Sequence, residues 1–167
     1  MRRSAFTLIE LLISITILSI IMVFLYQSYA TLNKSNKIFK QELELIENLR
    51  LKRKMIFLDL SIAKQKINIK HESIDIDTLL FQSSNSVHAR FNPYIAYIVN
   101  QNKLYRLESL KLLTYPLDMN SEFDVDFLGE VSRFKVFVNR KENTYIVDIV
   151  FVNKQNILLK VKVLNEI

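Results

Sequence analysis

Residues 6–26 read F-T-L-I-E-L-L-I-S-I-T-I-L-S-I-I-M-V-F-L-Y, and this stretch decides the fold. Its side chains are apolar except for Glu10 and a few hydroxyls. As an α-helix the segment would be about 30 Å long, which is enough to cross the hydrocarbon core of a bilayer. The sequence therefore predicts a membrane-spanning helix at this end of the chain.

Glu10 is the one ionised side chain within this apolar run. A carboxylate inside lipid costs roughly 2.5–3.5 kcal/mol on insertion scales. A partner, protonation or a position at the interface would lower that cost. Glu10 is therefore predicted to have a specific role.

The run follows a short basic leader, Met1-Arg2-Arg3-Ser4-Ala5. This order of leader, small residue, F-T-L-I-E and apolar helix resembles the N-terminus of type IV prepilins and type II secretion pseudopilins. The resemblance implies that a prepilin peptidase cuts between Ala5 and Phe6 and that Phe6 is then N-methylated. It also implies that Glu10 pairs with the terminal amine of a neighbouring subunit during assembly.

Ala5 departs from the family pattern, which usually has Gly at this position, so we expect slower or tolerated cleavage. Two other interpretations stay open for the segment. A secretory signal peptide would have a shorter apolar core and would be cut after it, near residues 26–30. A plain single-pass anchor or scaffold would keep its N-terminus uncleaved and would have no use for Glu10.

Composition excludes several kinds of site. The chain has no Cys, so disulfides, thiolate zinc sites and cysteine nucleophiles are excluded. Gly129 is its only glycine, which excludes the glycine-rich loops that cradle phosphates. The two histidines, His71 and His88, have no metal-ligand spacing and are expected on loops or the surface. The sequence thus predicts no enzyme, no cofactor and no metal site.

The net charge of +6 is modest, and its only dense basic run lies in the predicted helix. Nucleic-acid binding proteins gather Lys and Arg on one face. A contact with DNA or another polyanion is the weaker interpretation of this run, because nearby glutamates make a mixed-charge surface. The candidate residues are Arg50, Lys52, Arg53 and Lys54.

Beyond Tyr29 the helical pattern continues without Gly or Pro. Five apolar residues are spaced for one helix face, namely Leu49, Ile56, Leu60, Ala63 and Ile67. From Lys66 onward apolar residues alternate, which is typical of strands. We therefore predict an α+β fold, in which a long N-terminal helix packs on a mainly antiparallel β-sheet. The predicted divisions are a leader at 1–5, a transmembrane helix at 6–29, its amphipathic continuation at 30–65 and a β-rich domain at 66–167.

Two hairpins are predicted within the β-rich part. The first joins strands at 94–99 and 103–107 through Asn100-Gln101-Asn102, and the second joins 145–152 and 157–164 through residues 153–156. Another strand is expected at 131–138. Its N-terminal neighbours form an acidic stretch whose alternation with apolar residues favours a strand with one wet face over a calcium loop. These acidic residues are Asp118, Glu122, Asp124, Asp126 and Glu130.

Weaker features loosely resemble J-type pseudopilins and W-type minor pilins. These are Asp59-Leu60, the segment from Tyr97 to Arg106, and residues 129–136. Arg106 and Arg133 are expected to be ordinary surface arginines, with partner carboxylates as the alternative.

The resemblance implies a minor pilin-like subunit at the tip of a filament, serving type II secretion, a pilus or DNA uptake. Basic residues flank the span on both sides, so charge does not decide its orientation. The family implies a single-pass protein of the bacterial inner membrane with a periplasmic domain. Expected partners are other subunits, the prepilin peptidase, the assembly platform and the lipid bilayer. The alternative function is a module that binds DNA or a secreted protein.

Overall fold

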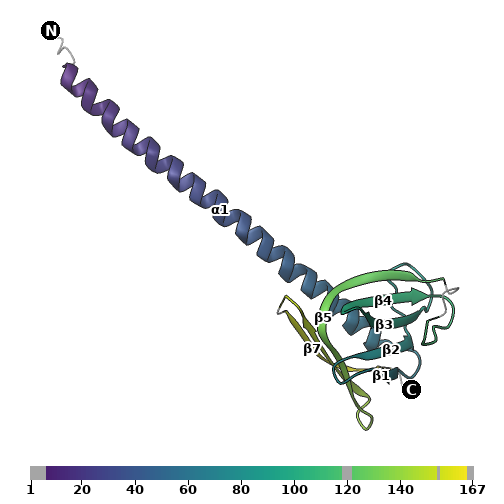
Figure 1. The fold of residues 1–167 in the computed structure, drawn as a ribbon. Coiled ribbons are helices and arrows are strands. Elements are labelled where there is room, and N and C mark those ends of the chain that lie inside the picture. Colours follow the sequence, from purple (N-terminus) through teal and green to yellow (C-terminus); the bar gives the residue numbers. More distant parts are fainter. Residues whose placement is uncertain (1–6, 118–121, 154, 165–167) are drawn as a thin grey trace. The chain divides into compact units, whose positions relative to one another are not determined.

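The computed structural model describes residues 7–117, 122–153 and 155–164 (Figure 1). The helix α1 spans Leu8–Ser61, and seven strands follow it in the described residues. Two compact units are distinguished, Met1–Glu47 and Asn48–Ile167, and their boundary lies within α1. The strands are β1 (Asn68–His71), β2 (Asp77–Gln82), β3 (Tyr94–Asn100), β4 (Lys103–Ser109), β5 (Asp124–Asn139), β6 (Thr144–Phe151) and β7 (Asn156–Lys162).

The predicted long helix is confirmed, but it ends at Ser61 and not near Gln65. Hydrogen bonds to the sheet explain the earlier end. The Lys64 N–H donates to the Gln82 carbonyl at 2.7 Å, and the Ile62 carbonyl accepts from the Ser84 N–H at 3.3 Å. The N–H groups of Ile62 and Ala63 still bond to the carbonyls of Leu58 and Leu60, but the Ile62 carbonyl and the Lys64 N–H have their partners on β2 and its following loop. A helical continuation would leave those partners without a hydrogen bond.

The seven strands form one sheet in the order β1-β2-β3-β4-β5-β6-β7, and every neighbouring pair is antiparallel. The predicted α+β class is confirmed. Both predicted hairpins are present, as β3–β4 and β6–β7. In the first, Gln101 and Asn102 have φ values of 49° and 59°, so the turn takes the left-handed backbone that suits the twist of a two-residue hairpin.

The strand β5 is longer than the one predicted at 131–138, because it includes the acidic stretch from Asp124 onward. Its first half pairs with β4 and its second half pairs with β6. Register shifts flank Gly129 on both sides, and such bulges bend a strand and increase its twist. Gly129 has φ +136°, and an added Cβ would lie 3.1 Å from the Phe151 ring. The only glycine therefore stands where β5 bends from one partner strand to the other.

The end of the β1–β2 hairpin contacts the second half of β5, so the sheet curls toward itself (Figure 1). The Phe134 N–H donates to the Asp75 carbonyl at 2.9 Å, and the Val136 N–H donates to the Asp77 carboxylate at 2.9 Å. Burial acts to raise the pKa of Asp77, but Lys135 and the Val136 N–H outweigh it and hold the pKa below its usual range.

The C-terminal turns of α1 and the residues just after them supply one side of the core. Ile56 and Leu60 of α1 and Ala63 beyond its end are almost fully buried and belong to the same apolar cluster as Tyr97 and Phe134 on the sheet. The five residues predicted to share a helix face do pack together, since Ile67 joins this cluster and Leu49 packs at its border, but Ala63 and Ile67 lie beyond the end of α1 and are therefore not on the helix. This packing holds the last part of α1 against the sheet within the second unit.

Candidate functional site

The N-terminal part of α1 is apolar on all sides. An 18-residue window of this helix has a mean hydropathy of 2.7, and none of that window is buried within the chain. Leu8, Ile20 and Phe24 are 82%, 69% and 67% exposed. By length and composition this part of α1 can cross a membrane. Its side chains need apolar surroundings that the chain itself does not provide.

Polar side chains inside this apolar part bond to the backbone of their own helix. The Ser14 hydroxyl donates to the Glu10 carbonyl at 2.7 Å, and the Ser19 hydroxyl donates to the Ile15 carbonyl at 2.8 Å. Thr16 does the same with the Ile13 carbonyl at 2.8 Å. These hydroxyls therefore add little to the cost of placing the helix in lipid or among other helices.

Glu10 has a partner within the chain. Its Oε2 accepts a hydrogen bond from the Thr7 N–H at 2.9 Å and another from the Thr7 hydroxyl at 2.9 Å. The Glu10 N–H in turn donates to the Thr7 hydroxyl at 3.4 Å. This reciprocal arrangement is a capping box, in which the first and fourth residues satisfy N–H groups at the start of a helix.

The capping box was missed from the sequence, although T-x-x-E before an apolar run is its known signature. It gives Glu10 a local role in starting α1. Both bonds from Thr7 use Oε2, so Oε1 stands outside the capping interaction. An ionised carboxylate can accept several hydrogen bonds, so capping and pairing with another chain are compatible. The predicted cleavage and methylation residues, Ala5 and Phe6, lie outside the described residues.

The four residues of the basic run differ in their surroundings. Lys52 places its Nζ 5.2 Å from the centre of the Phe151 ring, and partial burial there lowers the pKa of this lysine. Arg53 donates to the Leu158 carbonyl at 3.1 Å. Arg50 and Lys54 are exposed. A contact between these four residues and a polyanion stays a prediction.

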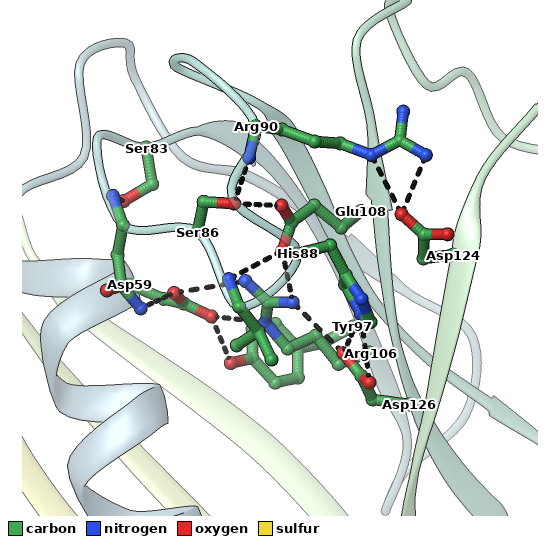
Figure 2. Close-up of polar contacts among 12 residues, drawn as sticks. Asp59, Ser83, Ser86, His88, Arg90, Tyr97, Arg106, Glu108, Asp124 and Asp126 are labelled. Carbon is green, nitrogen blue, oxygen red and sulfur yellow. Dashed lines mark hydrogen bonds and ion pairs between the residues drawn. The ribbon is translucent and has the colours of Figure 1, made fainter.

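A second candidate site is a buried polar cluster centred on Arg106 of β4 (Figure 2). Its guanidinium donates to Asp59 from Nε at 2.7 Å, and its Nη1 donates to Glu108 at 2.8 Å and to Asp126 at 3.1 Å. The side chains of Arg106, Asp59 and Glu108 are fully buried. Burial acts to lower the pKa of Arg106, but the surrounding carboxylates outweigh it and raise the pKa, so the guanidinium stays charged.

Asp59 connects α1 to this cluster. Besides Arg106, its carboxylate accepts hydrogen bonds from the Tyr97 hydroxyl at 2.6 Å and from Asn85 Nδ2 at 2.6 Å. Burial raises the pKa of the Asp59 carboxyl, and the contacts with Arg106, Tyr97 and Asn85 oppose the rise. Burial also raises the pKa of Tyr97. The cluster thus joins the helix, β3, β4 and the loop between β2 and β3.

Glu108 fixes that loop. Its carboxylate accepts hydrogen bonds from the Ser86 hydroxyl and from the Val87 N–H, the latter at 3.0 Å. Burial acts to raise the pKa of Glu108, but the bonds from Ser86, Arg106 and the Val87 N–H outweigh it and bring the pKa below its usual range. The loop is therefore held by a carboxylate that remains ionised.

The outer members of the cluster come from the acidic stretch of β5. Asp126 contacts His88 Nε2 at 3.0 Å, and Asp124 pairs with Arg90 at 2.7 Å (Figure 2). Within the described ranges, no group of three or more His, Cys, Asp and Glu side chains is arranged to hold a metal ion. Asp118, part of the calcium alternative, lies outside those ranges. Asp124 is instead engaged by Arg90, and Asp126 by Arg106 and the His88 ring.

The expectation that Arg106 lies on the surface was wrong, because the residue is completely buried among carboxylates. Arg133 is a surface arginine, as expected, with its side chain 48% exposed beside Asp75 and Asp148. Among the residues that the structure describes, no buried side-chain nitrogen or oxygen lacks a hydrogen-bond partner. The cluster therefore has the properties of a structural polar network, in which every buried polar group has a hydrogen-bond partner.

Comparison with known proteins adds one match. Residues 1–26 match the family model described as the prokaryotic N-terminal methylation motif. No curated protein and no solved structure matches the chain. The matched segment contains Glu10 and the start of α1. It supports a pilin-like or pseudopilin-type subunit that is anchored by a single helix, processed by a prepilin peptidase and assembled with other subunits.

Proposed function

We propose that this chain is a structural, non-catalytic minor subunit of a type IV pilus-like or type II secretion filament. The observation that carries the proposal is the apolar part of α1. The rest of the chain does not bury it, and it starts beside Glu10, whose carboxylate caps the helix. The match to the methylation motif covers the same residues. A helix of this kind has two suitable environments, the bilayer and a bundle of similar helices.

The proposed mechanism is a transfer between these two environments. Before assembly the apolar N-terminal part of α1 crosses the inner membrane, with the leader in the cytoplasm and the sheet domain in the periplasm. The peptidase then cuts between Ala5 and Phe6, and Phe6 is methylated. In the filament the apolar surfaces of other subunits replace lipid around α1. An assembly platform would drive this transfer.

Glu10 would set the register of this packing. The new amine of one subunit is cationic, and Glu10 of its neighbour is the carboxylate placed to receive it. In apolar surroundings an unpaired charge is costly, so the helices are most stable where amine and carboxylate meet. The Thr7 hydroxyl and N–H hold the carboxylate at the start of α1 for this contact.

The proposal predicts incorporation into filaments that depends on processing. In bacteria that assemble such filaments, a C-terminally tagged chain is expected in the sheared filament fraction when the prepilin peptidase is present. Without the peptidase the chain should remain in the membrane fraction at the same total level. A chain that stays in the membrane in both strains would contradict the proposal.

A further inference from the structure

The strand β1 lies at one end of the sheet order, and within the described residues no strand pairs with its outer edge (Figure 1). In the hairpin with β2, the Glu72 N–H donates to the Ile76 carbonyl at 3.0 Å. Hydrogen-bonded positions alternate along an antiparallel pair, so Lys70 also bonds to β2, whereas Ile69 and His71 direct their backbone groups away from it. The outer edge of β1 therefore presents the N–H and C=O groups of Ile69 and His71.

The second half of β5 has a similar open edge. The Phe134 N–H points away from β6 and donates to the Asp75 carbonyl. The Val136 N–H points the same way and donates to the Asp77 carboxylate. Two residues farther on, Val138 has the same orientation, but no described residue accepts a hydrogen bond from its N–H. Beyond its contacts with the β1–β2 hairpin, β5 thus has free backbone groups on this edge.

A cavity of about 540 Å³ lies between these two edges. Ile69 and His71 line it on the β1 side, and Val138 and Arg140 line it on the β5 side. Val138 is on the same face of β5 as the buried Val136, but it is 40% exposed. The core of the sheet domain therefore opens into the cavity at this point, between two strand edges that do not pair with each other.

The cavity is basic and contains an available hydroxyl. Lys66 and Arg140 line it, and both are exposed and pair with no carboxylate within the described part of the chain. Tyr145 is only 5% exposed, and no described residue forms a hydrogen bond with its hydroxyl. Since no fully buried side-chain oxygen in the described residues lacks a partner, this hydroxyl is accessible from the cavity that Tyr145 lines. Burial raises the pKa of Tyr145, so the hydroxyl stays protonated and can donate.

We propose that this cavity binds an extended, acidic peptide segment of another protein, which adds a strand between β1 and β5. The peptide backbone would pair with Ile69 and His71 on one side and with Val138 on the other. Its carboxylates would reach Lys66 and Arg140, and none of the described residues that line the cavity is acidic. The inference goes beyond the proposed function and does not rest on it, because all these residues belong to the second unit.

The strand edges favour a peptide over a small anion. A small carboxylate could pair with Lys66 or Arg140, but it could not use backbone groups on both walls of the cavity. An added strand offers backbone groups along both of its edges. Peptides that extend a sheet gain affinity from such main-chain hydrogen bonds and specificity from pockets for alternate side chains. The basic cavity would supply that specificity here.

Fluorescence anisotropy with the full-length chain in detergent tests the proposal. The probe is a labelled peptide of alternating valine and glutamate with a blocked C-terminus. It should bind and should slow amide hydrogen exchange at Ile69, His71 and Val138. A probe with lysine in place of glutamate should bind at least about tenfold more weakly. A probe with N-methylated glutamates keeps its charge but loses backbone donors, and it should also bind about tenfold more weakly.

Variants of the chain test the assigned residues. Lys66→Glu and Arg140→Glu should each weaken binding of the valine–glutamate probe roughly fivefold or more. The matched control is Lys160→Glu, which reverses the charge of an exposed lysine on β7 outside the cavity and should change binding less than about twofold. Tyr145→Phe removes only the hydroxyl and should weaken binding about threefold to tenfold. It should leave resistance to urea unchanged, because the hydroxyl has no partner in the folded chain.

Four outcomes would overturn the proposal. The first is absence of binding, and the second is equal binding by Lys66→Glu, Arg140→Glu and the unmodified chain. The third is displacement of the probe by free glutarate at the same concentrations as by unlabelled peptide, which would mean a site for small dicarboxylates. The fourth is slowed exchange at Ile69, His71 and Val138 in concentrated chain without the probe, which would mean that a second copy occupies the edges.

The proposed function is tested separately. A chain that binds the probe in the cavity but never enters sheared filaments would support this inference and contradict the proposed function. A chain that enters filaments but does not bind the probe would overturn this inference and leave the proposed function intact.

Discussion

Glu10→Gln is expected to reduce incorporation into filaments by tenfold or more while leaving membrane insertion intact. Glutamine can still accept the hydrogen bond from the Thr7 N–H, since Gln serves in capping boxes as Glu does. It removes only the negative charge. A hydrogen bond to a charged group contributes about 1.5–3 kcal/mol, and each 1.4 kcal/mol is a tenfold change in an equilibrium constant. Quantifying the tagged chain in sheared filaments and in membranes measures the effect.

Thr7→Ala is the matched control for this prediction. It removes the hydroxyl of the cap, at a cost of about 0.5–2 kcal/mol of helix stability, but keeps the carboxylate. Incorporation should fall much less than with Glu10→Gln, and Glu10→Ala should be at least as defective as Glu10→Gln. If Glu10→Gln assembled like the unmodified chain, Glu10 would act only as a helix cap and the proposed pairing would be wrong.

Arg106→Met should destabilise the sheet domain by about 3–5 kcal/mol. The substitution leaves Asp59 and Glu108 buried without their cation, and breaking a buried ion pair by removing one partner has this cost. Arg133→Met removes two exposed ion pairs, with Asp75 and Asp148, and should cost less than about 1 kcal/mol. Urea unfolding of the full chain in detergent, followed by pulse proteolysis, compares the two variants.

A third variant separates the loss of the buried ion pairs from the loss of a large side chain. Arg106→Lys keeps a positive charge but cannot make the forked contacts to Asp59 and Glu108, so its stability should lie between that of Arg106→Met and that of the unmodified chain. Equal stability of Arg106→Met and Arg133→Met would contradict the structural role given to the buried cluster.

The parts of the fold that were predicted from sequence depend on local patterns. The helix followed from a run without Gly or Pro, and the β3–β4 hairpin followed from asparagines between two apolar segments. The end of α1 was predicted near Gln65, four residues after its actual end at Ser61. The prediction was late because the hydrogen bonds that end the helix involve Gln82 and Ser84, which are distant in sequence. Nothing in the sequence near Ser61 contains that information.

The buried cluster was not predicted because its members are far apart in sequence. Asp59 and Arg106 are separated by 47 residues, and only the packing of α1 against β4 brings them together. An arginine between apolar residues of a strand can face either side, and the expectation of an ordinary surface arginine gave Arg106 the wrong environment. The capping box is different, since Thr7 and Glu10 are three residues apart and their T-x-x-E pattern can be recognised in the sequence.

The central claim is that the chain is processed as a pilin-like subunit at the segment that begins α1. Its most direct test is the mass of the N-terminal peptide of the protein recovered from cells that contain a prepilin peptidase. The account predicts a peptide that starts at Phe6 and carries one added methyl group. A peptide that starts at Met1, or one produced by cleavage after residue 26, would contradict it.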